Sequence, residues 1–355
     1  MEKRKWLFFL HNFIEPNHHA LAAGINQMMS FGVDYTFLCK RHLDNPLAKQ
    51  YQNNEKYTID NVPVIEDFWM NYRGLHVIYD GKPSLAVCSL AYIYDIPYLI
   101  SFHGGYDTHE IIYREKMNEK TVNLCNHASR ISVVCNKDKE LLVGFGINPD
   151  IIKIAPPAID LSILPNLSEK EINPYRIAVV GRLIPKKGIE YAIRALKDLP
   201  NKYQLDIVGD GEQKEALLAL AKELQVEDRI VWHGQLSLEE TLKIMAKDLI
   251  YWHPSIVDEG GNADGVPQAL VYAMALKRFV VASKYNHIDD LLKPNVNGFI
   301  CDVKKEGELA KVTLDNVTRY KEIGNEAYLS AKQYSIESQK NVYKEIYDDM
   351  EMKTK

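Results

Sequence analysis

Cysteine, net charge and long apolar runs are all scarce in this chain. Its 355 residues include five cysteines, which are widely spaced and form no Cys-x-x-Cys pair, so the sequence predicts reduced thiols rather than a disulfide framework. The formal net charge is −5, and without a basic excess the protein is poorly suited to nucleic acid, which we do not expect as a partner. No stretch approaches the roughly 20 apolar residues of a membrane-spanning helix.

The first residues of the sequence are not expected to act as a signal peptide. The apolar run at 6–10 has five residues, whereas a signal peptide needs about 7 to 15, followed by a small-residue cleavage site. We therefore expect a cytoplasmic protein. The basic triplet at 3–5 allows at most a peripheral contact with the inner face of the membrane. The alternative, which we favour, is a charged lead-in to a buried first strand.

The composition that is present is that of a soluble globular protein, with 46% hydrophobic and 26% charged residues. Short apolar runs alternate with helix-period segments, which predicts parallel sheets with helices on both faces. In the first half, the predicted strands are 6–10, 33–38, 76–79, 98–102, 131–135 and 152–155. The predicted helices there include 19–31, 84–94 and 108–126.

A chain of this length suits two domains, and a segment rich in proline and polar residues separates them. We place the first domain at 1–157, an interdomain linker at 158–174 and the second domain at 175–334. The predicted strands of the second domain are 175–180, 204–208, 229–233, 249–252, 279–282 and 298–301. Its predicted helices are 188–197, 212–224, 238–246, 267–275 and 306–320, with a helical tail over 325–352. The predicted fold class is α/β, with two doubly wound, Rossmann-like domains facing a cleft.

A strand, a cationic loop and a helix follow one another over 179–188. The strand ends at Gly181, the loop carries Arg182 and Lys187, and a helix is expected from about Gly188. A helix N-terminus has free N–H groups and a partial positive charge, so this segment suits a diphosphate. Taken alone, a solvated cationic loop without a ligand is an equally good interpretation.

A second turn, Gly209-Asp210-Gly211, follows the predicted strand 204–208. It resembles the start of a dinucleotide fingerprint, but Lys214 stands where the third glycine is required, so NAD binding is disfavoured. The pattern indicates either a glycine turn that lines a nucleotide site or simple turn chemistry.

An acidic, glycine-containing loop leads to Asp264 and to the predicted helix 267–275. Pro267 suits the first turn of that helix. The Asp264 carboxylate could accept strong hydrogen bonds from sugar hydroxyls, or it could cap the helix N-terminus. The segment alone favours the cap.

The order of these segments resembles that of the retaining glycosyltransferases of family 4, which have the GT-B fold and depend on nucleotide sugars. The resemblance rests on Gly-Arg-Leu-x-x-Lys-Lys-Gly at 181–188, Val-Gly-Asp-Gly-Glu at 208–212, His-Pro-Ser at 253–255, Asp-Gly-Val-Pro at 264–267 and Asn-Gly-Phe at 297–299. It covers roughly 175–302 and is weaker in the first half, at 101–105 and 131–136. It implies that the C-terminal helix, about 335–355, crosses back to the first domain.

The resemblance implies a role for each matching residue. Arg182 and Lys187 would hold the donor diphosphate, Asp264 would contact the donor sugar, and His103 would lie near the transferred sugar. The donor-binding candidates are Gly181, Gly209, Gly211, Gly265, Val266, Pro267 and Tyr272, of which 265–267 would bring backbone N–H groups to the phosphate or sugar. The acceptor-side candidates are Asn17, His18 and His109.

Two positions depart from the family pattern. Tyr272 stands where the second acidic residue of the family's Glu-x7-Glu motif accepts hydrogen bonds from the ribose, and a phenol is a weaker acceptor than a carboxylate. A ribose contact and plain core packing stay open as alternatives for this residue. The loop at 12–19 lacks the Gly-Gly that the family often has after the first strand, so the identity of the acceptor is not carried over.

The resemblance implies transfer of a sugar from a nucleotide sugar to an acceptor hydroxyl, with retention of anomeric configuration. The acceptor would be a carbohydrate or lipid-linked glycan in bacterial surface polysaccharide or glycoconjugate synthesis. We expect no metal ion and no cofactor, because no Asp-x-Asp motif follows a strand and the adjacent His18 and His19 would point apart. A sugar-nucleotide epimerase and a non-catalytic GT-B partner protein are the alternatives, and the oligomeric state is left open.

Overall fold

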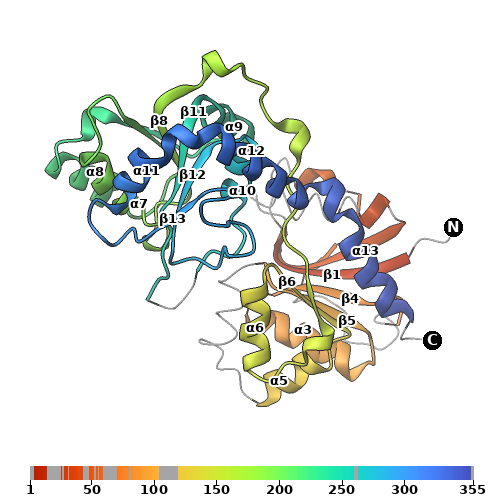
Figure 1. Ribbon diagram of the computed structural model, residues 1–355. Coiled ribbons are helices and arrows are strands. Elements are labelled where there is room, and N and C mark those ends of the chain that lie inside the picture. The colour runs from red at the N-terminus through yellow and green to blue at the C-terminus, as the bar shows by residue number, and fades with distance from the viewer. Residues whose placement is uncertain are drawn as a thin grey trace. The chain divides into compact units, whose positions relative to one another are not determined.

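The computed structural model describes residues 4–13, 25, 28–30, 32–42, 48–51, 53–54, 56–58, 70–79, 81–103, 119–259 and 263–352. The chain divides into two compact units, Met1–Ala158 with Ile336–Lys355 (unit 1) and Ile159–Ser335 (unit 2). Each unit is built on its own parallel sheet flanked by helices (Figure 1). The predicted α/β class of two doubly wound, Rossmann-like domains is confirmed. Nearly all of the segment 158–174, expected to be a linker, is counted with unit 2.

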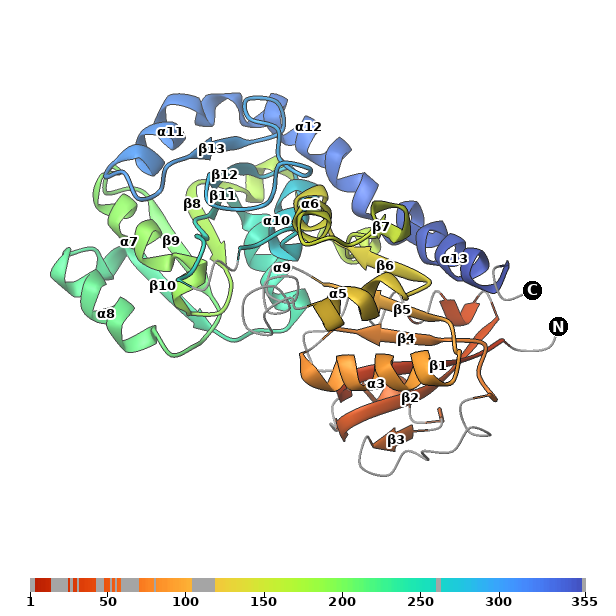
Figure 2. The ribbon, with the colours of Figure 1, turned by 90° about the horizontal axis from the view of Figure 1, so that it is seen from below.

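Unit 1 contains seven described strands in the order β3-β2-β1-β4-β5-β6-β7, and neighbouring strands are parallel (Figure 2). The strands are β1 (Arg4–Phe13), β2 (Val33–His42), β3 (Lys56–Thr58), β4 (Leu75–Ile78), β5 (Tyr98–Ser101), β6 (Arg130–Val133) and β7 (Ile152–Ile154). The described helices between them are α3 (Lys82–Ile93), α5 (Glu119–Asn126) and α6 (Asn136–Gly144). Every residue of β5 and β6 is buried, as expected for parallel strands that are covered on both faces.

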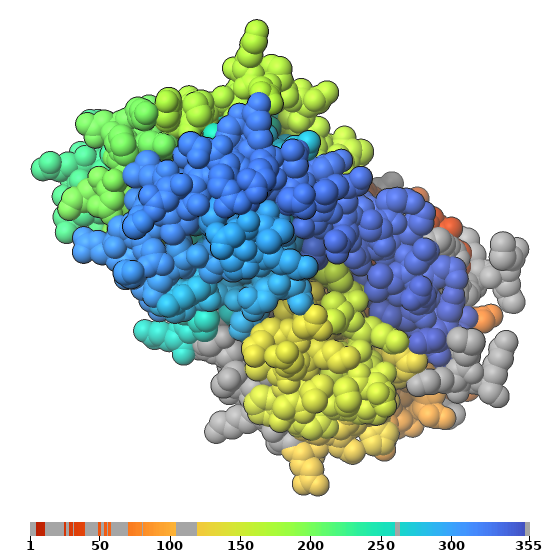
Figure 3. Space-filling view, in the orientation of Figure 1, coloured from red at the N-terminus to blue at the C-terminus, as the bar shows by residue number. Residues whose placement is uncertain are grey.

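Alternate residues of β1 point to opposite faces of the unit 1 sheet, and each face has its own core. Leu7 and Phe9 belong to the core that includes residues of α3 and α5. Trp6 and Phe8 belong to the core on the other face, which includes Tyr347 of α13 (Ile336–Met352). The C-terminal helix therefore returns to the first unit, as the resemblance implied, and Figure 3 shows its outward side as part of the molecular surface.

A series of hydrogen bonds among buried polar side chains also joins α13 to the sheet of unit 1. The Tyr347 hydroxyl lies 2.8 Å from the Tyr35 hydroxyl on β2 and 2.8 Å from the Nδ1 atom of His76 on β4. The Nε2 atom of His76 lies 2.7 Å from the Ser101 hydroxyl on β5, which in turn bonds to the Ser132 hydroxyl on β6. Burial holds the pKa of His76 well below its usual value. The imidazole is therefore neutral, so one nitrogen donates and the other accepts.

Unit 2 contains six described strands in the order β10-β9-β8-β11-β12-β13, also parallel. They are β8 (Asn173–Val180), β9 (Gln204–Val208), β10 (Ile230–Gly234), β11 (Asp248–His253), β12 (Phe279–Ser283) and β13 (Phe299–Cys301). Its helices are α7 (Ile189–Lys197), α8 (Lys214–Glu223), α9 (Leu238–Lys247), α10 (Gln268–Ala275), α11 (Glu308–Asn316) and α12 (Tyr320–Ala331). The α9 N-terminus carries a capping box in which Ser237 and Glu240 satisfy each other's backbone N–H groups.

The single helix predicted at 306–320 is wrong, because the structure divides this region into α11, the 3-10 turn η8 (Val317–Arg319) and α12. The helix α11 packs on α7, β13 and β12, whereas α12 packs on α10 and β12. The predicted tail helix 325–352 is also interrupted, at the 3-10 turn η9 (Lys332–Tyr334) and Ser335. Ser335 bridges to Ile159 where the chain passes from unit 2 to unit 1. Different packing partners, rather than local propensity, therefore set these breaks.

Tyr347→Phe tests whether the buried hydrogen bonds of Tyr347 stabilise unit 1. The substitution removes a hydroxyl that bonds to two buried groups, and we expect the free energy of unfolding to fall by about 1–3 kcal/mol. Urea denaturation followed by tryptophan fluorescence measures the change. Tyr92 on α3 is exposed, so Tyr92→Phe is the matched control. Equal effects of the two substitutions would contradict a stabilising role for the buried hydrogen bonds of Tyr347.

Candidate functional site

The loops that follow β8, β9 and β10 are tied together at the carboxyl edge of the unit 2 sheet. The Gly209 N–H donates to the Gly234 carbonyl at 2.8 Å, and the Leu183 N–H donates to the Asp210 carbonyl at 3.0 Å. Ligands of doubly wound sheets bind at this edge. The backbone here therefore forms a fixed base for a site.

Two glycines in the loop after β9 permit this close approach. Gly209 has a φ of 139°, and a Cβ atom there would overlap the Gly181 carbonyl oxygen. A Cβ atom on Gly211 would lie 2.6 Å from the Leu183 carbonyl oxygen. Any side chain at either position would force the neighbouring loop to move. The glycine turn thus has a packing role, while its predicted contact with a donor stays a prediction.

The loop after β8 also joins the loop after β11. A 3-10 turn, η6 (Pro185–Lys187), leads to Gly188 in the left-handed region with a φ of 61°, and α7 begins one residue later. A Cβ atom on Gly188 would overlap the Pro254 carbonyl oxygen. The Ile256 N–H donates to the Lys186 carbonyl at 2.8 Å. The cationic loop is therefore held against the His-Pro-Ser segment.

Side chains from these two loops converge on one buried carboxylate, that of Asp264. The Lys187 Nζ atom lies 2.7 Å from Oδ2, and the Lys186 Nζ atom lies 3.1 Å from Oδ1. His253, the last residue of β11, places its Nε2 atom 3.3 Å from Oδ2 without the geometry of a hydrogen bond. The Asp264 side chain is only 8% exposed. We call these four residues the Asp264 cluster.

Burial and charge oppose each other in the Asp264 cluster. Burial by itself raises the pKa of Asp264, but the Lys187 ammonium, with His253 and Lys186, holds that pKa well below its usual value. Burial lowers the pKa of Lys187, and the ion pair with Asp264 offsets part of this effect. Burial also lowers the pKa of His253. At neutral pH an ionised carboxylate therefore lies beside a neutral imidazole.

Arg182 is exposed and stands outside these ion pairs. Within the described ranges, its guanidinium has neither a hydrogen bond nor an ion pair. Its positive charge nevertheless contributes to lowering the pKa of Lys187, after burial and Lys186. A guanidinium at the carboxyl edge of the sheet, close to a second cation and engaged by none of the described carboxylates, is available to an anionic ligand.

The sequence predicts Arg182, Lys187 and Asp264 as site residues, but it does not predict roles for Lys186 or His253. Both are visible in the sequence, Lys186 in Lys-Lys-Gly and His253 in His-Pro-Ser. Adjacent residues of a strand or helix point apart. The spacing therefore does not reveal that the turn η6 directs both lysines to one carboxylate.

The segment before α10 differs from expectation in two respects. Pro267 is the N-cap residue of α10 and not part of its first turn, and Asp264 does not cap the helix. The cap favoured for the isolated segment is wrong because two lysines from a distant loop offer charged partners to the carboxylate. Gly265 and Val266 are buried in this lead-in.

Tyr272 lies on α10 with 4% of its surface exposed. Burial raises the pKa of its phenol, and a hydrogen bond from the Asp160 backbone opposes this effect. These surroundings favour the core-packing alternative over the ribose contact.

The first-domain candidates are described only in part. His103 follows β5 and is half-buried, and its charge contributes, after burial, to lowering the pKa of His76. Asn17, His18 and His109 lie outside the described residues, as does most of the predicted helix 19–31. The predicted roles of these four site residues stay predictions.

The described residues show no cluster of three or more His, Cys, Asp or Glu side chains placed to hold a metal ion. All five cysteines are free and buried, which agrees with the prediction of reduced thiols. No helix in the described part of the chain combines the length and apolar character needed to cross a membrane.

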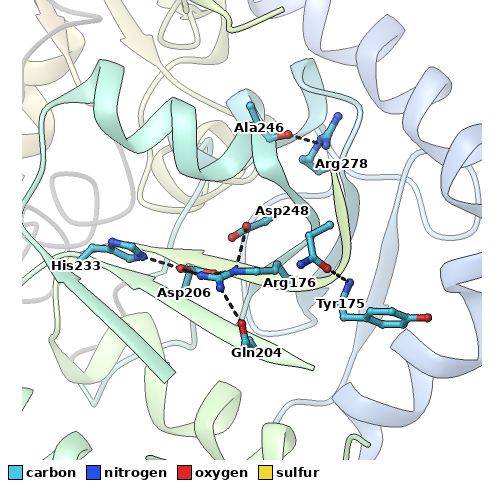
Figure 4. A network of polar contacts seen from close by, with 9 residues as sticks. Tyr175, Arg176, Gln204, Asp206, His233, Ala246, Asp248 and Arg278 are labelled. Carbon is cyan, nitrogen blue, oxygen red and sulfur yellow. Dashed lines mark hydrogen bonds and ion pairs between the residues drawn. The ribbon is translucent and has the colours of Figure 1, made fainter. Parts of the chain in front are cut away.

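A network of polar and charged side chains joins β8, β9, β10 and β11, the four strands that precede the loops of the candidate site (Figure 4). Arg176 on β8 donates through Nε and Nη2 to the carboxylate of Asp206 on β9, and its Nε atom lies 3.7 Å from Asp248 on β11. The Nε2 atom of His233 on β10 lies 2.6 Å from Asp206. Burial raises the pKa of Asp248 to about 8, with Asp206 adding to the effect and Arg176 opposing it. Asp248 therefore keeps its proton near neutral pH.

Both parts of the chain match glycosyltransferase family models. Residues 165–328 match the model described as "Glycosyl transferases group 1", and residues 43–163 match the model described as "Glycosyltransferase Family 4". The first match lies in unit 2, and the second lies almost wholly in unit 1.

Curated relatives show the same similarity over part of their length. An amylovoran biosynthesis glycosyltransferase of Erwinia amylovora is 29% identical over 187 residues, covering 52% of this chain and 43% of the relative. A putative colanic acid biosynthesis glycosyltransferase of Salmonella typhimurium is 28% identical over 163 residues, covering 45% and 40%. The chain thus spans about half or less of the length of these relatives.

Solved structures match the fold over nearly the whole chain. The crystal structure of Anabaena HepE in complex with UDP-glucose has a TM-score of 0.78 and 19% identity, covering 98% of this chain and 99% of that one. A glycosyltransferase from Rickettsia africae has a TM-score of 0.79 and 15% identity, covering 99% of both chains. The fold is that of GT-B proteins, and the family models and relatives show that both parts of the chain are similar to glycosyltransferases.

Asp248→Asn tests the protonated state of Asp248. In the unfolded chain this carboxyl ionises near its ordinary pKa, whereas in the folded protein it holds its proton up to about pH 8. The folded state therefore binds more protons between about pH 4 and 8, so Asp248 makes stability fall as the pH rises through this window. We expect the amide, which cannot ionise, to reduce that fall in melting temperature. The exposed Asp228→Asn is the control, and an unchanged pH dependence in Asp248→Asn would contradict the assignment.

Proposed function

We propose that this protein transfers a sugar from a nucleotide sugar to an acceptor hydroxyl with retention of anomeric configuration. The observation that carries the proposal is the meeting of Arg182 and the Asp264 cluster at the carboxyl edge of the unit 2 sheet. Cations on fixed loops at that edge suit an anionic nucleotide. The glycosyltransferase models that match both parts of the chain supply the reaction class.

In this proposal the donor diphosphate binds Arg182 and Lys187. The start of α7 lies directly after the cationic loop and contributes the partial positive charge of a helix N-terminus. Lys187 is held at 2.7 Å by Asp264 before a ligand arrives. Its ammonium group is therefore positioned in advance and does not have to be ordered during binding.

The bond from the anomeric carbon to the diphosphate oxygen breaks, and a bond from the acceptor oxygen forms on the same face of the sugar. The departing diphosphate takes the acceptor proton, so no enzymic nucleophile is required. Negative charge grows on the diphosphate as the bond breaks, and the cations of the site stabilise that charge more in the transition state than in the ground state. Protein cations would thus serve without a metal ion or other cofactor.

The remaining roles follow the family resemblance. Asp264 with the segment 265–267 would contact the donor sugar and phosphate, and Gly181, Gly209 and Gly211 would line the donor site. His103 would lie near the transferred sugar, with Asn17, His18 and His109 on the acceptor side. We propose a carbohydrate or lipid-linked glycan acceptor in surface polysaccharide or glycoconjugate synthesis, and a cytoplasmic location with at most peripheral contact with the membrane.

A thermal-shift screen of nucleoside diphosphates and their sugars tests the proposal directly. A specific ligand raises the melting temperature by mass action, and we expect one base to do so at concentrations at which the other bases do not. If no nucleotide has an effect, the transferase proposal fails and a non-catalytic protein is supported. A new sugar nucleotide formed from the donor without an acceptor would instead identify an epimerase.

Arg182→Ala tests the diphosphate contact without disturbing the Asp264 cluster. The loss of one charge-assisted hydrogen bond, worth about 1.5–3 kcal/mol, predicts binding of the nucleoside diphosphate that is about 10- to 100-fold weaker. Calorimetric titration measures the change, and the melting temperature without ligand should not change because Arg182 is exposed. The control is Arg194→Ala, an exposed arginine on α7. Equal affinities of the two variants would refute the contact.

Tyr272→Phe distinguishes a ribose contact from core packing at Tyr272, the residue that departs from the family's Glu-x7-Glu motif. Because the phenol is buried and interacts with the Asp160 backbone, we expect the melting temperature to fall while nucleotide affinity is unchanged. Calorimetry with the nucleotide identified in the screen measures the affinity. A weaker affinity at unchanged stability would restore the ribose contact.

A further inference from the structure

His253 is a buried titratable side chain to which the proposed mechanism gives no role. It ends β11 with a side chain that is 4% exposed, and its ring stacks on Tyr251 at an interplanar angle of 15°. Its Nε2 atom makes no hydrogen bond with any described residue, although an oxygen of Asp264 lies only 3.3 Å away. A polar atom this deeply buried normally has a partner. The 3.3 Å separation is therefore short enough for an ion pair with Asp264, and a small reorientation of the imidazole or the carboxylate would form the hydrogen bond.

Charged groups approach His253 from several elements. The ammonium groups of Lys186 and Lys187 come from the loop after β8, and the Asp264 carboxylate comes from the lead-in to α10. Tyr251 lies on β11 itself. The loop after β12 contacts Asp264 through the backbone N–H of His287, which donates to the Asp264 carbonyl at 2.8 Å. Two ammonium groups and one carboxylate therefore lie near the imidazole, so the surrounding charge is positive.

This charge balance explains why the imidazole is neutral before a ligand binds. Protonation would add a third positive charge to a buried group that already holds two cations and one anion. Burial lowers the pKa of His253, and the repulsion from Lys187 and Lys186 adds to that effect while Asp264 opposes it. The Asp264 carboxylate, for its part, is already satisfied by the two lysines.

A bound diphosphate reverses this balance. Its negative charges would offset the lysine charges and compete with Asp264 for the Lys187 ammonium, because phosphate oxygens are strong acceptors from charged donors. Both effects favour a positive charge on His253. Both ring nitrogens of the imidazolium would carry a proton, and after a small reorientation Nε2–H would donate to Asp264 Oδ2, which replaces the interaction that Lys187 gives up.

We propose that His253 takes up a proton when a nucleoside diphosphate or its sugar binds, and that the resulting imidazolium holds Asp264 in place of Lys187. This inference rests on the proposed function, because it requires the diphosphate to reach Lys187. His253 is then a positioning residue that keeps Asp264 ionised and oriented while the lysine serves the phosphate. Release of the nucleotide returns the proton to solvent.

Calorimetric titration in buffers of different ionisation enthalpy counts the protons taken up on binding. UDP-glucose, GDP-mannose and ADP-glucose are the probes, because a diphosphate that is esterified at both ends has no proton of its own to exchange near neutral pH. At pH 7.5 we expect wild-type protein to take up a measurable fraction of one proton. Linkage also predicts affinity that weakens as the pH rises, by at most about tenfold per pH unit.

His253→Gln should abolish the proton uptake, whereas the exposed His127→Gln in unit 1 should leave it unchanged. If His253→Gln does not fold, the proton count and the pH dependence of affinity in the wild-type protein still decide the question. Binding of a probe without proton uptake overturns the role of His253 and leaves the proposed function standing. Failure of all three probes to bind overturns both.

Discussion

The sharing of Asp264 between Lys186 and Lys187 is the interaction on which the candidate site of unit 2 depends. Two lysines with little exposure would be costly without a counter-charge, and one carboxylate that accepts from both makes their burial tolerable. The same contacts join the loop after β8 to the segment before α10. A binding surface that would otherwise consist of separate loops is thereby fixed before any ligand is present.

The strands of unit 2 could be read from the sequence with good accuracy. The predicted strand 204–208 coincides with β9, and the other predicted strands overlap β8 and β10–β13, because buried parallel strands give short, apolar, β-branched runs. Helix ends were less well predicted, since the breaks around Val317–Arg319 and Ser335 follow from which neighbours each helix packs against.

Some residues of the candidate site could be predicted from the sequence, but their contacts with one another could not. Arg182, Lys187 and Asp264 stand out as residue types at the ends of strands, so sequence order alone points to them. The pairing of Lys187 with Asp264 joins residues 77 positions apart, and no local pattern encodes such a contact. Glycine spacing likewise indicated a turn after β9, but it did not reveal that Gly209 has to clear the Gly181 carbonyl oxygen.

The return of α13 to unit 1 has a consequence for biosynthesis. Trp6 and Phe8, near the N-terminus, share a core with Tyr347, which is translated more than 300 residues later. The part of this sheet face that α13 covers is therefore exposed on the nascent first unit until the whole of unit 2 has been made. Because exposed apolar surface favours aggregation, we expect a chain that ends near Ser335 to be less stable and more prone to aggregate than one that includes α13.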